Sequence, residues 1–249
     1  RAEHRAIFAI ALPMIISNIA APLLGLIDTA IIGHLPQSIY LSGVALGAMV
    51  VSFTFLLCIF LRMTTTAEIA HAVGAQRSDL AQQTAVHAVV IAILLGVALI
   101  ILRPVILELA WFIIQPEPDL RFYASQYIHI RLWAAPAALI NLLVLGVLLG
   151  RQQAKYAMGL VIFTNAVNLV ADIVLILGLE LNVVGAAWAA VLAETSTAVV
   201  GLWLIRDLLP PIPLWRITPR YFKQFGAMNR DVFIRSLLLQ FCMAVMTGY

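Results

Sequence analysis

Long apolar segments recur along the 249-residue chain, separated by short polar breaks rich in glycine and proline. A helix needs about 20 apolar residues to cross the roughly 30 Å hydrocarbon core of a bilayer. Six runs meet that length, and a seventh continues to the last residue. They cover residues 6–32, 40–61, 84–107, 125–149, 156–177 and 183–205, and the seventh begins near residue 227.

Composition agrees with a membrane environment. Hydrophobic residues make up 63% of the chain and charged residues 11%, against about 45–50% and 25% in soluble domains. The mean hydropathy is +1.02. A soluble protein of this length could not bury so much apolar surface away from water. The sequence therefore predicts an all-α membrane protein, a six-helix transmembrane bundle with most of a seventh helix.

The distribution of Lys and Arg predicts the orientation. With the N-terminus in the cytoplasm, the outer side holds only Arg103, Arg121 and Arg131. This is a strong positive-inside bias. The inner segments hold Arg1, Arg5, Arg62, Arg77, Arg151, Lys155, Arg206, Arg216, Arg220, Lys223 and Arg230.

Three segments follow from these patterns. Residues 1–205 form an N-terminal six-helix lobe, whose first apolar run is too long for a signal peptide and is expected to be a retained helix. Residues 206–226 form a basic cytoplasmic linker, expected to lie on anionic lipid headgroups. Residues 227–249 begin a second lobe of the same polypeptide, most of which is missing from this chain.

Two carboxylates, Asp28 and Asp172, lie inside apolar runs, each about five residues from the outer end. An acid at the bilayer centre costs about 2.5–3.5 kcal/mol even on the lenient insertion scale, so such residues usually face a cavity and bind something. Asn165 and Asn168 share a helical face with Asp172. These oxygens suit a proton or cation site. Interhelical hydrogen bonding is the alternative for the fifth-helix group, and a position at the interface is the alternative for Asp28.

Glu194 lies near the middle of the sixth run, where it either pairs with a polar neighbour or lines the same cavity. Pro13, about four turns below Asp28, is a candidate hinge, because proline removes a backbone hydrogen bond and kinks helices.

The sequence contains no catalytic constellation. The five histidines are scattered without ligand spacing, Cys58 and Cys242 fall inside apolar runs, and nucleophile-elbow, zinc-protease, P-loop and dinucleotide motifs are absent. An enzyme, an organic cofactor, a resident metal and a nucleic-acid partner are therefore not expected.

Several motifs, in order, resemble the multidrug and toxic compound extrusion (MATE) transporters, over essentially the whole chain. They are PMIISN at 13–18, LGLIDTAIIGH at 24–34, LRMTTT at 61–66, NLVAD at 168–172 and GAAWAA at 185–190. MNRD at 228–231 and RSLLLQ at 235–240 are similar to the bacterial DinF (DNA-damage-inducible F) subfamily.

The resemblance implies twelve helices in two lobes and export of hydrophobic, often cationic compounds in exchange for protons or sodium. It also implies that Asp28, Asn168 and Asp172 are the coupling residues and that Pro13 is the bending proline. Many members carry Thr where this chain has Ala190. The missing hydroxyl favours H⁺ over Na⁺ as the coupling ion, with Na⁺ at Asp28, Asn168 and Asp172 as the alternative.

We therefore expect a cation-coupled antiporter of the bacterial inner membrane that exports drug-like small molecules. A lipid-linked oligosaccharide flippase is the nearest rival, but it predicts several basic residues inside the cavity. An intramembrane enzyme would need a nucleophile paired with a base, and Ser17, Ser52 and Cys58 have no such partner nearby in sequence.

Overall fold

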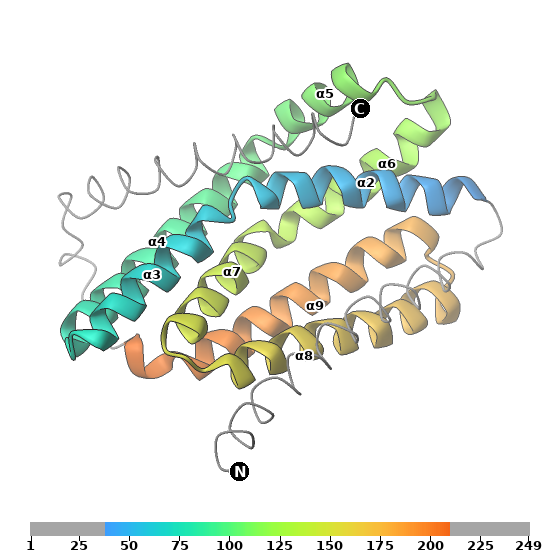
Figure 1. Cartoon of the computed structure of the whole chain (residues 1–249). Coiled ribbons are helices and arrows are strands. Elements are labelled where there is room, and N and C mark those ends of the chain that lie inside the picture. Colours follow the sequence, from blue (N-terminus) through green and yellow to red (C-terminus); the bar gives the residue numbers. More distant parts are fainter. Residues whose placement is uncertain (1–37, 210–249) are drawn as a thin grey trace, which may run out of the picture.

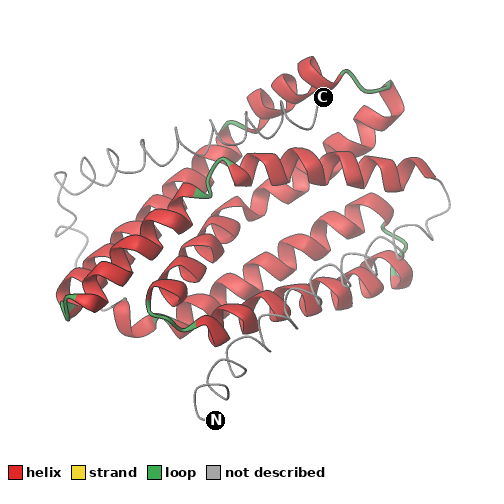
Figure 2. Ribbon diagram, viewed as in Figure 1, coloured by secondary structure: helices red, strands yellow, loops and turns green. Residues whose placement is uncertain are grey.

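The computed structural model describes residues 38–209; residues 1–37 and 210–249 lie outside the description. Within 38–209 every regular element is a helix, joined by short loops (Figures 1 and 2). The main helices are α2 (Ser38–Leu56), α3 (Phe60–Gly74), α4 (Ser78–Ile101), α5 (Arg103–Ile114), α6 (Pro118–Arg131), α7 (Ala135–Gly150), α8 (Ala154–Asp172) and α9 (Asn182–Leu204). Three short pieces complete the order: the 3-10 turns η1 (Leu132–Ala134) and η3 (Arg206–Leu208), and the π-helical η2 (Ile173–Gly178).

Five stretches within residues 38–209 are long and apolar enough to cross a membrane. They match the second to sixth apolar runs and confirm the expected class, an all-α membrane protein; the first and seventh runs lie outside the described residues. The five are Ser38–Gly74, Ser78–Ile101, Pro118–Gly150, Ala154–Gly178 and Asn182–Leu204.

The second run continues further than its hydropathy indicates. We expected it to end at residue 61 with Arg62 in an inner segment, but α3 carries the helix on to Gly74. Leu61, Thr65 and Ile69, which lie four residues apart, are fully buried and hold this polar segment helical through one packed face.

Prolines interrupt two of the other runs. Pro104 stands in the first turn of α5 and Pro136 in the first turn of α7. A proline there lacks the N–H that would continue the preceding helix, and its ring clashes with the carbonyl four residues earlier. Each run therefore divides in two, α4 from α5 and α6 from α7.

The helices of the described bundle pack lengthwise against one another. α2 lies along α6, α3 along α4 and α7, and α8 along α9, while α7 and α9 occupy the middle of the bundle (Figure 1). Small residues permit the close approaches. A Cβ added at Gly96 would lie 2.4 Å from Pro136 Cα, and one at Gly47 would lie 2.7 Å from the Tyr127 ring.

The outside of the described bundle is strongly apolar. Phe112 is 77% exposed and Ile101 is 70% exposed, with many other large apolar side chains on the same surface. A soluble monomer rarely presents so much contiguous apolar area, whereas lipid chains would cover it in a membrane. The polar side chains described next point inward instead.

Candidate functional site

Asp172 is the last residue of α8 and is only 2% exposed. Asn168, one turn earlier on the same face, donates a hydrogen bond from Nδ2 to Asp172 Oδ2 at 3.1 Å. The predicted common face therefore brings these two side chains into contact.

The backbone changes immediately after Asp172. Residues 173–178 form η2, a π-helical turn, and this wider geometry is uncommon and is often found at functional sites. It widens the turn of α8 beside the acid, next to the short connection into α9.

Asn165 behaves differently from Asn168. Its Nδ2 donates to the carbonyl of Val161 on its own helix at 2.9 Å, and its side chain borders a pocket between α7, α8 and α9. The structure thus divides the three candidate site residues of α8 into a hydrogen-bonded pair, Asn168 and Asp172, and a pocket residue, Asn165.

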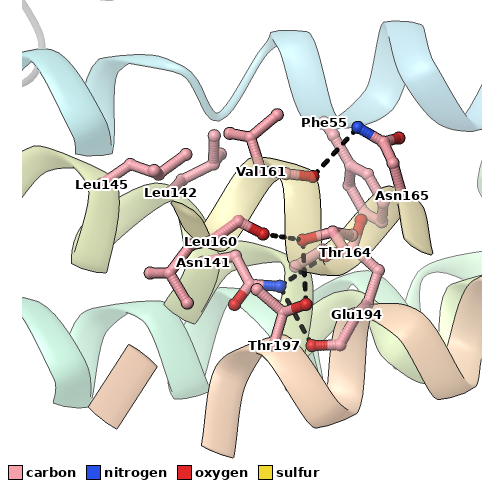
Figure 3. Close-up of a pocket in the computed structure, with 11 residues that line it drawn as sticks. Phe55, Asn141, Leu142, Leu145, Leu160, Val161, Thr164, Asn165, Glu194 and Thr197 are labelled. Carbon is pink, nitrogen blue, oxygen red and sulfur yellow. Dashed lines mark hydrogen bonds between the residues drawn. The ribbon is translucent and has the colours of Figure 1, made fainter. Parts of the chain in front are cut away.

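The pocket has a cavity volume of about 240 Å³ (Figure 3). Most of its wall is apolar, and its polar groups are contributed by three helices. It is lined by Phe55 of α2, Ala138, Asn141, Leu142 and Leu145 of α7, Leu160, Val161, Thr164 and Asn165 of α8, and Glu194 and Thr197 of α9.

Glu194 is held at this pocket by two residues. Arg131, on α6, donates a hydrogen bond from Nη2 to Glu194 Oε1, and the two atoms lie 2.9 Å apart. Asn141 Nδ2 donates both to Glu194 Oε2 and to the Glu194 backbone carbonyl (Figure 3). Glu194 therefore pairs with polar neighbours, which is one of the two interpretations considered for it. It also lines this pocket, but Asp172 and Asn168 are not among the pocket's lining residues, so a cavity shared with Asp172 stays a prediction.

Arg131, counted among the charges of the outer side, is buried among the helices, and the structure does not test the side of the membrane on which it lies. Its side chain is 11% exposed and lies within the bundle, with the guanidinium carbon 5.5 Å from the centre of the Phe55 ring. A buried guanidinium needs a counter-charge, and Glu194 supplies it. Sequence reasoning missed this pairing and also missed Asn141, whose only signal was a lone amide in an apolar run.

Tyr127 lies near the charged residues of α6, α8 and α9. Its buried phenol lies one turn before Arg131 on α6 and is within electrostatic range of Arg131, Glu194 and Asp172.

The register of α8 against α9 places Ala190. Thr164 and Thr197 hydroxyls lie 2.8 Å apart, and the two helices run antiparallel (Figure 1). Counting eight residues from this contact, about 12 Å at 1.5 Å per residue, leads to Asp172 on α8 and to residue 189 on α9. Asp172 therefore lies level with residue 189 and its neighbour Ala190. Ala190 is partly buried and offers no side-chain oxygen at that depth.

Charged residues also gather at the far end of the lobe. Arg151 Nη1 and Nη2 donate to the two carboxylate oxygens of Asp207 at 3.1 and 2.7 Å, beside a pocket of about 330 Å³ that Arg77 also borders. These hydrogen bonds hold the pKa of the Asp207 carboxyl below its ordinary value. This charged cluster lies near the start of α8, at Ala154. Asp172 lies 18 residues further along α8, about 27 Å along the helix axis.

Asp28 and Pro13 fall outside the described residues, so their expected roles stay predictions. Within residues 38–209, no group of three or more His, Cys, Asp or Glu side chains could hold a metal ion.

Comparison with known proteins agrees with this architecture. The MatE family matches residues 13–174. The chain is 42% identical over 253 residues to DNA damage-inducible protein F of Escherichia coli, covering 98% of this chain and 54% of that protein. It is 28% identical to the probable multidrug resistance protein NorM of Thermotoga maritima, covering 84% of this chain and 47% of the relative.

Two solved structures share the fold. A MOP superfamily transporter from Pyrococcus furiosus is 27% identical with a TM-score of 0.83, and an outward-facing multidrug resistance MATE family transporter is 28% identical with a TM-score of 0.82. Each alignment covers 98% of this chain and 54% of the other.

The chain therefore belongs to the MatE family and spans about half the length of the curated relatives it matches most fully. The resemblance to this family and to DinF, expected from the sequence motifs, is confirmed.

Proposed function

We propose that this chain is one lobe of a cation-coupled antiporter that exports hydrophobic or cationic small molecules across the bacterial inner membrane. Residues 1–205 form the N-terminal lobe in this proposal, residues 206–226 the cytoplasmic linker, and residues 227–249 the start of the second lobe. The N-terminus lies in the cytoplasm, and the second lobe completes the substrate path.

The burial of Asp172 carries the proposal. A carboxylate that is 2% exposed, in a helix suited to cross a membrane, carries a cost in free energy, and such residues usually mark a functional site. Asn168 supplies one hydrogen bond to it. In the proposed mechanism Asp172, together with Asp28, takes up a proton or cation and thereby releases the substrate, while Pro13 allows the first helix to bend.

Protons are the coupling ion in this proposal. Hard cations are bound by several oxygen ligands, as Ca²⁺ and Mg²⁺ are, and Ala190 supplies no side-chain oxygen at the depth of Asp172. A buried carboxylate that accepts a hydrogen bond from an amide, as Asp172 does from Asn168, can instead exchange a proton. No cofactor is required for such a cycle.

The charge of the pocket supports an antiporter over a flippase. A pyrophosphate-linked substrate would require several unneutralised basic groups. None of the residues that line the described pocket is basic, and Arg131, which contacts Glu194 of this pocket, is neutralised by it. The mostly apolar wall around these groups suits a hydrophobic or cationic compound.

Drug efflux from everted vesicles of the full-length protein, with pH and sodium gradients imposed separately, tests the proposal. We expect the pH gradient to drive efflux and Asp172→Asn to abolish it, while Glu180→Gln, in an exposed loop acid, transports normally. Normal coupled efflux by Asp172→Asn would overturn the assignment.

A further inference from the structure

Arg103, the first residue of α5, carries a charge that the described part of the chain does not neutralise. None of the ion pairs between described residues includes it. Glu108, the acid nearest to it in sequence, lies five positions further along α5, about 140° around the helix. The guanidinium therefore has no carboxylate partner within residues 38–209.

The guanidinium is held against the end of α6. Its Nη1 donates a hydrogen bond to the backbone carbonyl of His129 at 3.3 Å, and its Cζ lies 5.6 Å from the centre of the Trp133 ring. His129 and Trp133 are four positions apart, about one helical turn, so one short stretch supplies both contacts. These contacts fix the position of the charge without supplying a negative charge.

Part of the guanidinium is open to a ligand. The side chain of Arg103 is partly exposed. Among its nitrogens only Nε is buried without a partner, and Nη2 makes no hydrogen bond to a described residue. Nη2 can therefore donate its two N–H groups to a ligand, and guanidinium groups suit the oxygens of phosphate particularly well.

The surroundings of Arg103 are those of the boundary between hydrocarbon and headgroups. α4 is 24 residues long, about 36 Å, slightly more than the roughly 30 Å hydrocarbon core, and Arg103 follows directly after it. An exposed tryptophan is typical of this boundary. The exposed apolar side chains next to the charge are those of Ile101, Leu102, Val105 and Trp133.

We propose that Arg103 and Trp133 form a binding site for the phosphodiester group of an anionic phospholipid, in the outer leaflet under the proposed orientation. The phosphate oxygens accept hydrogen bonds from Nη2 and supply the counter-charge, and the acyl chains lie on the apolar side chains around it. A zwitterionic headgroup would bring its ammonium next to Arg103, where no described carboxylate forms an ion pair. The inference requires that these helices lie in a membrane and does not depend on the transport mechanism.

Lipid binding to the purified full-length protein in detergent, counted by native mass spectrometry, tests the site. The probes are phosphatidylglycerol and phosphatidylcholine with the same acyl chains. Arg103→Gln removes the charge, and Arg121→Gln is the matched control, because it removes the charge of an exposed arginine of α6. We expect Arg103→Gln to bind the first phosphatidylglycerol roughly tenfold more weakly, the loss of one charge-assisted hydrogen bond, and Arg121→Gln to bind it normally.

The choice between the two lipids is a second measurement. The unmodified protein should prefer phosphatidylglycerol to phosphatidylcholine, and Arg103→Gln should lose this preference. The ratio of the two affinities is insensitive to a partial loss of folded protein, because both lipids report on the same folded fraction.

Several results would contradict the site. Equal binding of phosphatidylglycerol by Arg103→Gln and the unmodified protein would indicate that water or a carboxylate of the second lobe compensates Arg103. Equal weakening in Arg103→Gln and Arg121→Gln would reduce the effect to net charge. The absence of a preference in the unmodified protein would exclude an anionic headgroup, and displacement of the lipid by equimolar inorganic phosphate would indicate a site for a free anion instead.

Discussion

Arg131 of α6 donates a hydrogen bond to Glu194 of α9 at 2.9 Å, although 63 positions separate the two residues in the chain. The pair ties two helices together where both side chains are largely buried, at 11% and 20% exposure. Removing one member leaves the other charge without compensation, which in buried pairs costs about 3–5 kcal/mol.

A double-mutant cycle tests this coupling. We expect Arg131→Met and Glu194→Gln each to lower the free energy of unfolding in detergent by about 3 kcal/mol. The double variant should lose less than the sum of the two, with a coupling energy of about 0.5–3 kcal/mol. Strictly additive losses would show that the two charges do not depend on each other.

The tight crossing of α4 and α7 gives a second prediction. An alanine Cβ at position 96 would lie 2.4 Å from the backbone of Pro136, so Gly96→Ala should lower stability by about 1–3 kcal/mol through overpacking. Thermal denaturation of the purified protein measures this.

Gly159→Ala is the matched control, because no atom lies within 4 Å of a Cβ added at that position of α8. Alanine in a helix is more favourable than glycine by up to about 1 kcal/mol, so this variant should be as stable as the unmodified protein or more so. Equal losses in the two variants would contradict the close contact at Gly96.

Acid pH should weaken the contact between Arg151 and Asp207. Because its pKa is lowered in the folded protein, the Asp207 carboxylate contributes stability above its unfolded pKa, about 3.9, and loses it as pH falls through the folded value. Asp207 is 53% exposed, so solvent screening limits the contribution to at most about 1 kcal/mol.

Asp207→Asn should therefore denature at a slightly lower temperature than the unmodified protein at pH 7, and the difference should shrink at pH 3. Glu180→Gln, which changes an exposed acid in the loop before α9, is the control. A difference that grows toward low pH would contradict the sign of the linkage.

Hydropathy alone located the five described spans, because each needs about 20 apolar residues. It did not find the continuation through α3, where polar side chains hide a buried face of Leu61, Thr65 and Ile69, nor did it predict the breaks at Pro104 and Pro136. Hydropathy averaged over a window of the sequence measures how apolar a segment is. It does not show which face of the helix is packed against its neighbours.

The candidate site was predictable where its residues are close in sequence. The spacing of Asn168 and Asp172 places them on one helical face, and they are hydrogen-bonded. Arg131 stands near the start of an apolar run and was counted only among the outer-side charges. Its pairing with Glu194 was not predicted, because that counter-charge lies on a helix whose packing the sequence does not encode locally.

Ala190→Thr tests the proposal that protons are the coupling ion. The new hydroxyl would stand on α9 at the depth of Asp172 and add an oxygen for a cation. We expect the unmodified transporter to show little sodium dependence at zero pH gradient, and the variant to gain sodium-stimulated efflux. Strong sodium-driven efflux by the unmodified protein would contradict the choice of the proton.

Proton exchange at Asp172 is the most direct test of the proposed coupling. In weakly buffered solution, binding of a cationic substrate to the purified full-length protein should release protons, because substrate and proton compete for the carboxylates. Asp172→Asn should release about one proton fewer per molecule at a pH where the unmodified protein is loaded, and Glu180→Gln should release the normal number. Equal proton release by Asp172→Asn and the unmodified protein would contradict the central claim.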